Sequence, residues 1–390
     1  MKRKQSFGAG LTALILAGCA TQSTPSPTPT QIPASDPASP SPTPQPSAPA
    51  APAFEIQPGD VPDSPVGSSM TIVYPMAEGF AAIGFDGAFG SILWSSPDGR
   101  SWTDVTPEGF ASVGIVSVVP FEGGFVGVGR ANTTEVDLEV AAVYRSDDGL
   151  DWRRVTGDDM DGQLIDVVAT DAGLFAVGGV PAADAAGIWH STDGESWSRV
   201  GPDLEHAFLW SIAEGGPGLV AVGWRRNPEP DLAVWTSADD GRTWELSQDP
   251  ERGAGSEATD VIALESGDIS MVGGAHDGSG GRMWASADGI TWELAMIDGS
   301  DLIPGAVART VSSLSGGLVA VGGSETMEAL AWFSADGRSW EQIDGSATPN
   351  AYFPAAVSVD GSMLIAGATQ EGTMETGIKS HAQIWIASLR

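Results

Sequence analysis

The chain has 390 residues and a formal net charge of −33 at pH 7, from 51 acidic and 18 basic side chains. This excess of negative charge argues against a nucleic-acid partner and against docking of the protein surface on anionic lipid. The 51 glycines favour strands and turns over helices, and the single cysteine excludes an internal disulfide.

The first 18 residues predict a secretory signal peptide. Lys2, Arg3 and Lys4 precede an apolar run over residues 11–17, and a basic segment followed by an apolar one is typical of such signals. The run is shorter than the about 20 apolar residues that cross a bilayer as a helix. A signal peptide over residues 1–18 is therefore preferred to a transmembrane anchor.

Residues 16–19, Leu-Ala-Gly-Cys, resemble the lipobox of bacterial lipoproteins. The resemblance implies cleavage before Cys19 and transfer of a diacylglycerol group to its thiol. Each buried methylene contributes about 0.8 kcal/mol, so two or three acyl chains hold a protein on a membrane without a spanning helix. We therefore expect a protein anchored through Cys19 at the outer face of a bacterial cell membrane.

A segment rich in Pro, Ser, Thr, Ala and Gln follows over residues 20–53. Such a segment buries too little apolar surface to offset the entropy of ordering the chain. Its prolines favour extended geometry at about 3 Å per residue. Residues 19–53 are thus expected to be a disordered tether, and residues 54–390 to hold the folded domain.

A short turn that ends in tryptophan returns six times along the remaining chain. The six tryptophans are 45 to 50 residues apart, a period that fits one four-stranded blade of a β-propeller and exceeds most helical repeats. Asp and Ser accept hydrogen bonds from nearby amides in such turns, and glycine supplies a positive φ. The six turns are 96–102 (SPDGRSW), 146–152 (SDDGLDW), 191–197 (STDGESW), 237–244 (SADDGRTW), 286–292 (SADGITW) and 334–340 (SADGRSW).

These turns resemble the Asp-box of sialidase-like propellers, Ser-x-Asp-x-Gly-x-Thr-Trp. Only residues 237–244 have the full spacing, and the other five copies lack one residue between Asp and Gly. In such proteins the Asp-box lies on the outer, bottom side and is structural. The resemblance therefore implies structural roles for Asp98, Asp148, Asp193, Asp239, Asp288 and Asp336.

An aromatic residue stands two positions before each box serine, and a seventh such position is Trp385. The chain ends at Arg390, so the seventh unit lacks an outermost strand, and an open ring would leave unpaired strand edges. Residues 54–58 resemble the outer strands that begin at Trp102 and Trp340. We predict an all-β, seven-bladed propeller whose last blade is closed by this N-terminal strand; the alternative is a disordered segment up to Met70.

Two tryptophans, Trp210 and Trp224, lie outside the repeated positions, and Trp224 is followed by Arg225 and Arg226. Propeller topology places them on the face opposite the Asp-box turns. An indole beside two guanidinium groups suits a sugar ring, a carboxylate or an aromatic ligand. The alternative is that the tryptophans are loop anchors and the arginines neutralise acidic neighbours.

A second set of candidate ligand-binding residues comprises Asp166, Asp260, Arg309 and Tyr352. Asp166, Asp260 and Thr310 occupy equivalent repeat positions on inner strands, so the two carboxylates are expected to face the centre of the ring. There they would hold water or a cation, or form an ion pair with Arg309, which we prefer. Tyr352 precedes the last inner strand.

Enzymatic activity is weighed against these binding roles. Sialidases use an arginine cluster, a tyrosine nucleophile with a glutamate partner and an acid/base aspartate, and their early Arg-Ile-Pro motif is absent here. A pair of carboxylates is all that other glycosidases require, but 51 acidic residues make such a pair uninformative. No motif indicates a metal, serine or nucleotide site, so no catalytic residue, metal or cofactor is assigned.

The function expected from the sequence is that of a monomeric, non-catalytic envelope lipoprotein. Its propeller face would bind a protein partner or an extracellular or cell-wall glycan. The alternative is a glycoside hydrolase or lyase of sialidase-like fold. A scaffold that binds other envelope proteins through residues 130–139 and 369–382 is a third possibility.

Overall fold

The computed structural model describes residues 54–88, 90–132, 139–157, 160–180, 183–226, 229–247, 255–314, 316–343, 348–359, 362–373 and 377–389. The expected signal peptide, Cys19 and the tether lie outside these residues. Contacts separate the chain into Met1–Ala48 and Pro49–Arg390, and all the described residues belong to the second unit. Among them, no helix has the length and apolarity needed to span a membrane.

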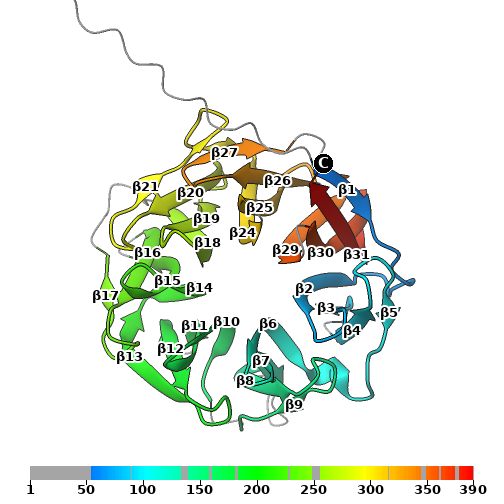
Figure 1. Cartoon of the computed structure of the whole chain (residues 1–390), viewed down its shortest axis with the longest axis horizontal. Helices are drawn as coiled ribbons and strands as arrows, with labels where there is room; N and C mark the ends of the chain where they lie inside the picture. Colours follow the sequence, from blue (N-terminus) through cyan, green and yellow to red (C-terminus); the bar gives the residue numbers. More distant parts are fainter. Residues whose placement is uncertain are drawn as a thin grey trace, which may run out of the picture. The chain divides into compact units, whose positions relative to one another are not determined.

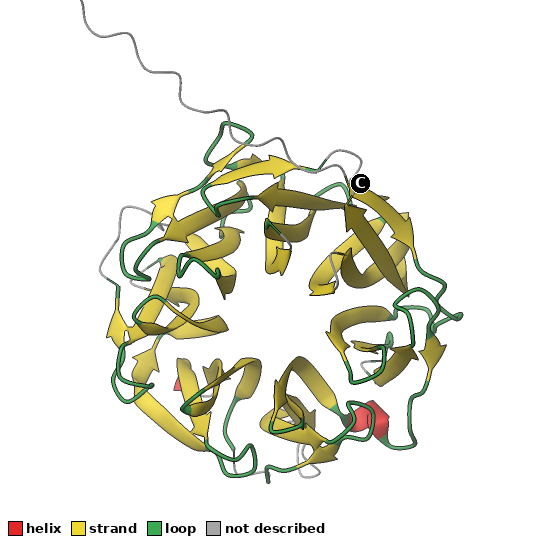
Figure 2. Cartoon of the chain, in the orientation of Figure 1, coloured by secondary structure: helices red, strands yellow, loops and turns green. Residues whose placement is uncertain are grey.

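Seven sheets, antiparallel except for one added strand, succeed one another around a ring, so the fold is a seven-bladed β-propeller (Figure 1). Strands form nearly all of the ring, with a short 3-10 helix, η1 (Phe110–Ser112), between blades 1 and 2 (Figure 2). Blade 1 comprises β2 (Ser69–Pro75), β3 (Phe80–Phe85), β4 (Ser91–Ser96) and β5 (Thr103–Asp104). Blade 2 comprises β6 (Gly114–Phe121), β7 (Gly124–Asn132), β8 (Glu139–Ser146) and β9 (Arg153–Arg154).

The next three blades repeat the same order from an inner to an outer strand. Blade 3 comprises β10 (Gln163–Thr170), β11 (Gly173–Val180), β12 (Ala185–Ser191) and β13 (Ser198–Glu205). Blade 4 comprises β14 (Ala207–Gly215), β15 (Gly218–Arg226), β16 (Pro230–Ser237) and β17 (Glu245–Leu246). Blade 5 comprises β18 (Ser256–Ala263), β19 (Ile269–Ala275), β20 (Gly280–Ser286), β21 (Glu293–Leu294) and the added β23 (Ile303–Pro304).

Blades 6 and 7 depart from the simple order. Blade 6 comprises β24 (Ala306–Leu314), β25 (Gly317–Ser324), β26 (Glu328–Ser334) and β27 (Ser339–Gln342), with added strands β22 (Met296–Ile297) and β28 (Thr348–Pro349). Blade 7 comprises β29 (Ala351–Val359), β30 (Ser362–Thr373), β31 (Gly377–Leu389) and, outermost, β1 (Phe54–Pro58).

The N-terminal strand closes the ring, as predicted. β1 pairs antiparallel with β31, from Phe54 opposite Leu389 to Pro58 opposite Trp385, and Figure 1 shows the two strands side by side in blade 7. The chain then continues across the boundary to blade 1, where the Asp60 amide donates to the Arg100 carbonyl at 2.7 Å. Closure therefore joins blade 7 to blade 1 through backbone hydrogen bonds, and the alternative of disorder up to Met70 is wrong.

The six Asp-box turns have the structural role that the resemblance implied. In the first, Asp98 Oδ1 accepts from the amides of Arg100 and Ser101 at 2.8 and 2.9 Å, while the Trp102 indole donates to the Gly99 carbonyl at 3.0 Å. Four of the other turns repeat these bonds. In the longer turn of blade 4, the amide and hydroxyl of Thr243 donate to Asp239, and the Trp244 indole donates to the Gly241 carbonyl. The turn amides lower the pKa of five of the six aspartates: Asp98, Asp148, Asp193, Asp239 and Asp288.

The repeated aromatic residues pack between the blades. The seven third-strand residues, including Trp284 and Trp332, are at most 5% exposed. Each neighbouring pair of blades buries such rings together with Val, Ile, Leu and Ala from its strands, as in the cluster around Trp284 and Trp292. Burial of rings this large contributes strongly to joining the blades.

One glycine per blade explains the repeated Val-Gly pattern of the second strands. A β-bulge interrupts the pairing of each inner strand with the second strand. Beside the bulge, a Cβ atom on the glycine would lie only 1.9–2.1 Å from a backbone oxygen of the inner strand, so no larger residue fits. These glycines are Gly84, Gly129, Gly178, Gly223, Gly273, Gly322 and Gly367.

Candidate functional site

The bulge in each inner strand marks one equivalent side-chain position in every blade. In blades 1 to 7 the residues that follow the bulge are Ile72, Ser117, Asp166, Ser211, Asp260, Thr310 and Ala355. The predicted equivalence of Asp166, Asp260 and Thr310 is therefore confirmed. The five polar members are consecutive, from blade 2 to blade 6, so neighbouring blades bring them into contact.

Asp166 joins blade 3 to the blades on both sides. Its Oδ1 accepts from the Ser117 hydroxyl at 2.8 Å, and its Oδ2 accepts from the Ser211 hydroxyl at 2.9 Å and the Ile212 amide at 3.0 Å. The Val167 amide donates to Oδ1 at 2.9 Å. All the polar contacts of this half-buried carboxylate are thus made by hydroxyl and amide groups.

Asp260 repeats the arrangement two blades further on. Its Oδ2 accepts from the Thr310 hydroxyl at 2.6 Å and the Val311 amide at 2.8 Å. Its Oδ1 lies 2.8 Å from the Ser211 hydroxyl and 2.9 Å from the Val261 amide. Ser211 therefore stands between the two carboxylates, and together the five side chains form what we call the polar arc: Ser117, Asp166, Ser211, Asp260 and Thr310.

The polar arc has one proton fewer than its contacts need. Four oxygen–oxygen contacts link it, but its three hydroxyl groups supply only three protons, because Ser211 can donate to one carboxylate at a time. Hydrogen bonding at all four contacts requires a fourth proton on Asp166 or Asp260. Burial raises the pKa of Asp166. Burial also raises the pKa of Asp260, to about 6; the hydrogen bond from Thr310 lowers this pKa, and the negative charge of Asp166 raises it.

The ion pair expected between Arg309 and these carboxylates does not form. Among the described residues Arg309 makes no ion pair, and its Cζ instead lies 5.7 Å from the centre of the Tyr352 ring, across the boundary between blades 6 and 7. Arg309 is exposed, because its neighbour Thr310, after the bulge, takes the position that faces the carboxylate. Hydroxyl and amide groups already donate hydrogen bonds to both carboxylate oxygens of Asp260, so this side chain does not need the Arg309 guanidinium as a partner.

The second candidate set lies at the end of blade 4 that is opposite the Asp-box turns. The register places Ala207 opposite Arg225, and Arg225 opposite Asp231, so the start of β14, the end of β15 and the start of β16 share this end. We call the end of the ring opposite the Asp-box turns the upper face. Trp224 and the two arginines therefore lie on the face that the sequence predicted.

Trp224 is held between two basic groups. The Arg226 guanidinium carbon lies 5.6 Å from the centre of its ring, and the His276 ring of blade 5 meets it edge-on at 6.1 Å. The indole keeps part of its surface exposed. A cation over an aromatic ring contributes about 0.5–1 kcal/mol at exposed sites, so this arrangement holds the ring in place while leaving it accessible.

Trp210 is brought into the same cluster by an acid of blade 5. Its indole nitrogen donates to Glu257 Oε2 at 3.2 Å, and the same oxygen lies 3.9 Å from His276 Nε2. On its other side Trp210 packs against Phe208, with ring centres 4.5 Å apart. Trp210, Glu257, His276, Trp224 and Arg226 thus form one continuous surface across blades 4 and 5, which we call the aromatic corner.

A pocket of about 450 Å³ opens next to the aromatic corner, between blades 3 and 4. Arg225, Arg226 and His206 lie on its walls, with Trp235 and Trp244 among the apolar lining residues. His206 Nδ1 is 2.6 Å from Asp184 Oδ2. Within the part of the chain that the structure describes, neither arginine side chain forms a hydrogen bond or ion pair, so both remain available to an anion.

Residues 276–281 form a turn in which the Ser279 amide donates to Asp277 Oδ1 at 2.8 Å, and the described residues include no group of three or more His, Cys, Asp or Glu that could hold a metal. Residues 369–382, expected to be a loop, largely extend the β30–β31 hairpin out to Thr373 opposite Gly377, because strand pairing satisfies their backbone groups. Much of the loop 130–139 lies outside the described residues.

Sequence reasoning missed Ser117, Ser211, Phe208 and Glu257. The two serines occupy the same repeat position as Asp166 and Asp260, so aligning the inner strands on the Val-Gly of the second strand would have found them. Phe208 and Glu257 carry no comparable signal. Their importance comes from packing between blades 4 and 5, which the sequence of a single blade does not reveal.

No protein-family model and no curated protein sequence matches the chain. Among solved structures, a catalytically inactive virginiamycin B lyase from Staphylococcus aureus, solved with quinupristin, aligns with a TM-score of 0.59 and 10% identity over 86% of this chain and 100% of that chain. The polysaccharide lyase Uly1 aligns with a TM-score of 0.51 and 11% identity over 83% of this chain and 90% of that chain. The Trypanosoma rangeli sialidase aligns with a TM-score of 0.44 and 13% identity over 74% of this chain and 56% of that chain. At this identity the likeness to the lyases is one of fold alone.

Proposed function

We propose that the protein is an envelope lipoprotein whose propeller binds a carboxylate-bearing glycan at the aromatic corner and the adjoining pocket. The observation that carries the proposal is the pair Arg225 and Arg226, which are unpaired within the described residues although the chain has a net charge of −33. Glu205 lines the same pocket and Asp231 lies opposite Arg225 in the sheet, but neither acid forms an ion pair with these arginines among the described residues, so both guanidinium groups can bind an anionic ligand.

The chemistry of the surface suits a sugar acid. Trp224 offers a partly exposed ring of the kind on which a sugar stacks, and Arg225 offers two parallel donors for a carboxylate. Glu257 and Asp184 are acceptors for sugar hydroxyl groups at either end of the surface. A neutral glycan would leave the arginines without a partner, so the charge selects an acidic one.

The position of the N-terminal strand agrees with this role. Phe54 pairs with Leu389 at the end of β31, which corresponds to the Asp-box end of the other blades. The described chain therefore enters the propeller at the Asp-box end, and the aromatic corner lies at the opposite end of the ring.

Binding to an array of uronic acid and neutral oligosaccharides tests the proposal. The full chain should bind uronic acid oligomers, Arg225→Ala should weaken binding at least tenfold, and Trp224→Ala should have a similar effect. Arg242→Ala is the matched control, since it removes the same charge from an exposed side chain in the Asp-box turn of the same blade and should bind like the natural chain. Equal glycan binding by all variants would reject the proposal. Recovery of a protein partner whose binding is unchanged by these substitutions would also reject it.

A glycoside hydrolase or lyase is the second candidate, and the Arg309–Tyr352 stack on blades 6 and 7 is the observation that favours it. Polar-arc carboxylates are poorly suited to catalysis, because hydroxyl and amide groups already contact all four of their oxygens. The candidate acid or nucleophile would therefore be Tyr352. Turnover of aryl glycosides by the full chain that is lost in Tyr352→Phe would support an enzyme.

A further inference from the structure

The propeller adds an extra strand to its own outer edge at two places. In blade 1 the segment after β1 lies beside the box tryptophan: the Asp60 amide donates to the Arg100 carbonyl at 2.7 Å, and the Trp102 amide donates to the Asp60 carbonyl at 2.9 Å. Asp60 and Ser101 form a parallel bridge. An extended segment thus pairs with the backbone around the box tryptophan.

Blade 6 repeats this arrangement with an unrelated segment. The Met296 amide donates to the Arg338 carbonyl at 2.8 Å, and the Asp298 amide donates to the Trp340 carbonyl at 3.0 Å. β22 is accordingly parallel to β27. Arg338 is the second residue before its box tryptophan, as Arg100 is in blade 1, so the same backbone carbonyl accepts the added strand in both blades.

Among the described residues, no segment pairs with the equivalent backbone of blade 3. Its counterparts are the Glu195 carbonyl and the Trp197 amide and carbonyl, and none of them forms a hydrogen bond among the described residues. We call residues 195–198 the blade-3 edge. Trp197 is also the one box tryptophan that is not buried; the other five are at most 8% exposed. Within the part of the chain that the structure describes, nothing therefore covers in blade 3 the surface that blades 1 and 6 cover with their own chain.

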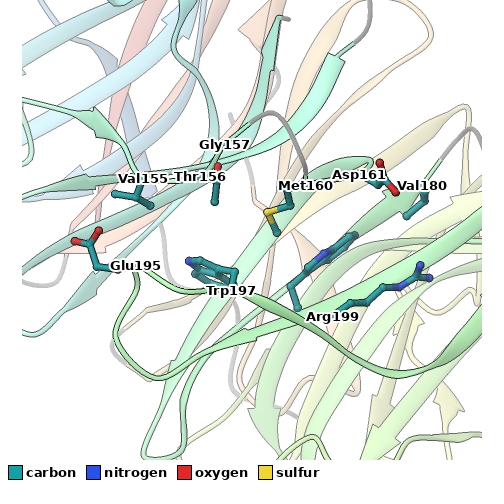
Figure 3. A pocket seen from close by; sticks show the side chains of 10 residues that line it. Val155, Thr156, Gly157, Met160, Asp161, Val180, Glu195, Trp197 and Arg199 are labelled. Carbon is teal, nitrogen blue, oxygen red and sulfur yellow. The ribbon is translucent and has the colours of Figure 1, made fainter.

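A pocket of about 410 Å³ adjoins this edge. Val155, Met160 and Val180 form its apolar walls together with Trp189 and Trp197, while Figure 3 shows Glu195 at one end and Arg199 reaching toward Asp161 and Val180 at the other. In blades 1 and 6 the corresponding indole pairs pack in clusters that include Val61 and Ile297 of the added segments. The pocket thus stands where an aliphatic side chain of the added strand lies in the other two blades.

We propose that the blade-3 edge binds an extended peptide of a partner protein, which adds to blade 3 as a parallel outer strand and places a Val or Ile side chain in the pocket between Trp197 and Met160. Main-chain hydrogen bonds would supply the affinity, and the pocket would supply the specificity. Residues 20–53 of the same chain suit the edge poorly, because their many prolines lack the amide donors that Asp60 and Met296 provide. This surface is separate from the aromatic corner.

The added segment of blade 6 supplies the probe. A fluorescent peptide of residues 293–300, ELAMIDGS, is titrated with the full chain. N-methylation of the peptide at the position of Met296 or Asp298 removes an amide that donates to the blade in the natural arrangement, and each should lower affinity at least tenfold. N-methylation at Ile297, whose amide instead bonds the Ser300 carbonyl within the segment, should change affinity less than threefold.

A variant of the protein locates the binding site. Met160→Trp fills the pocket and should abolish peptide binding, while Ile290→Trp places the same residue at a position that is 51% exposed and should leave it intact; an unchanged melting temperature verifies that each folds. Absence of binding at millimolar peptide would overturn the proposal. An affinity that is unchanged by Met160→Trp and by every N-methyl group would overturn it as well. Binding that appears only after deletion of residues 20–53 would also overturn it, since the tether would then be the natural occupant.

Discussion

Replacing Asp260 by Asn should remove a pH-dependent loss of stability that is built into the polar arc. Burial raises the pKa of Asp260 from 3.8 to about 6 in the folded protein. A rise of about two pH units corresponds to roughly 3 kcal/mol between the two protonation states. An acid whose pKa is raised on folding stabilises the fold fully below its unfolded pKa and loses that contribution as the pH rises through its folded pKa. The relevant window is therefore about pH 4 to 6.

Urea unfolding followed by tryptophan fluorescence between pH 4 and 8 measures this contribution. The natural chain also loses stability with pH through its general negative charge, so the informative quantity is the free energy of unfolding of the natural chain minus that of Asp260→Asn. We expect this difference to fall by about 2–3 kcal/mol between pH 4 and 7. The other titratable and charged groups on this and the nearby inner strands are Asp166, Glu214, Glu257 and Arg309, and both proteins contain all four.

Asp239→Asn is the control, because the pKa of Asp239 is shifted in the opposite direction from that of Asp260. Hydrogen bonds from the Thr243 amide and hydroxyl lower the pKa of Asp239, so its contribution to stability is complete above about pH 4 and is lost only as the pH falls through its lowered folded pKa. Its difference profile should be flat from pH 4 to 8. If Asp260→Asn gives the same flat profile, no proton is retained by the polar arc and the count of three hydroxyl protons for four contacts is wrong. Ser211→Ala, which removes the bridging hydroxyl, provides a second variant should Asp260→Asn fail to fold.

Four further outcomes are expected. Deleting residues 54–60 should lower the melting temperature by roughly 10 °C or more, because blade 7 loses its outer strand and its bonds to blade 1; an unchanged melting curve would contradict closure. Trp292→Ala should cost about 3–5 kcal/mol in urea unfolding through loss of a 2% exposed ring. Gly322→Ala should lower the free energy of unfolding by about 1–3 kcal/mol, since its Cβ would lie 2.0 Å from the Val307 oxygen. Gly323→Ala should lower it less, because its Cβ would lie 3.2 Å from the nearest atom, the Glu328 oxygen. Cys19→Ser should abolish labelling by radioactive palmitate and release the protein from membranes, and retained labelling would reject lipidation at this residue.

The repeated turns were sufficient to predict the ring, because each unit carries its own local signals. Six Ser/Asp/Gly/Trp turns at 45 to 50 residues mark the blades, and the missing outer strand of the seventh unit indicated that residues 54–58 would complete it. The equivalence of Asp166, Asp260 and Thr310 also followed from aligned repeats. These features depend on residues close together in one unit.

The contacts between units came from the packing of neighbouring blades. The Ser211 bridge between Asp166 and Asp260 depends on the side chains after three successive bulges meeting between neighbouring inner strands, and a one-residue difference in register would separate them. Arg309 was expected to pair with a carboxylate but stacks on Tyr352, because Thr310 takes the facing position. A single blade encodes which side chains it presents, whereas the angle and spacing at which the next blade packs determine which of them touch.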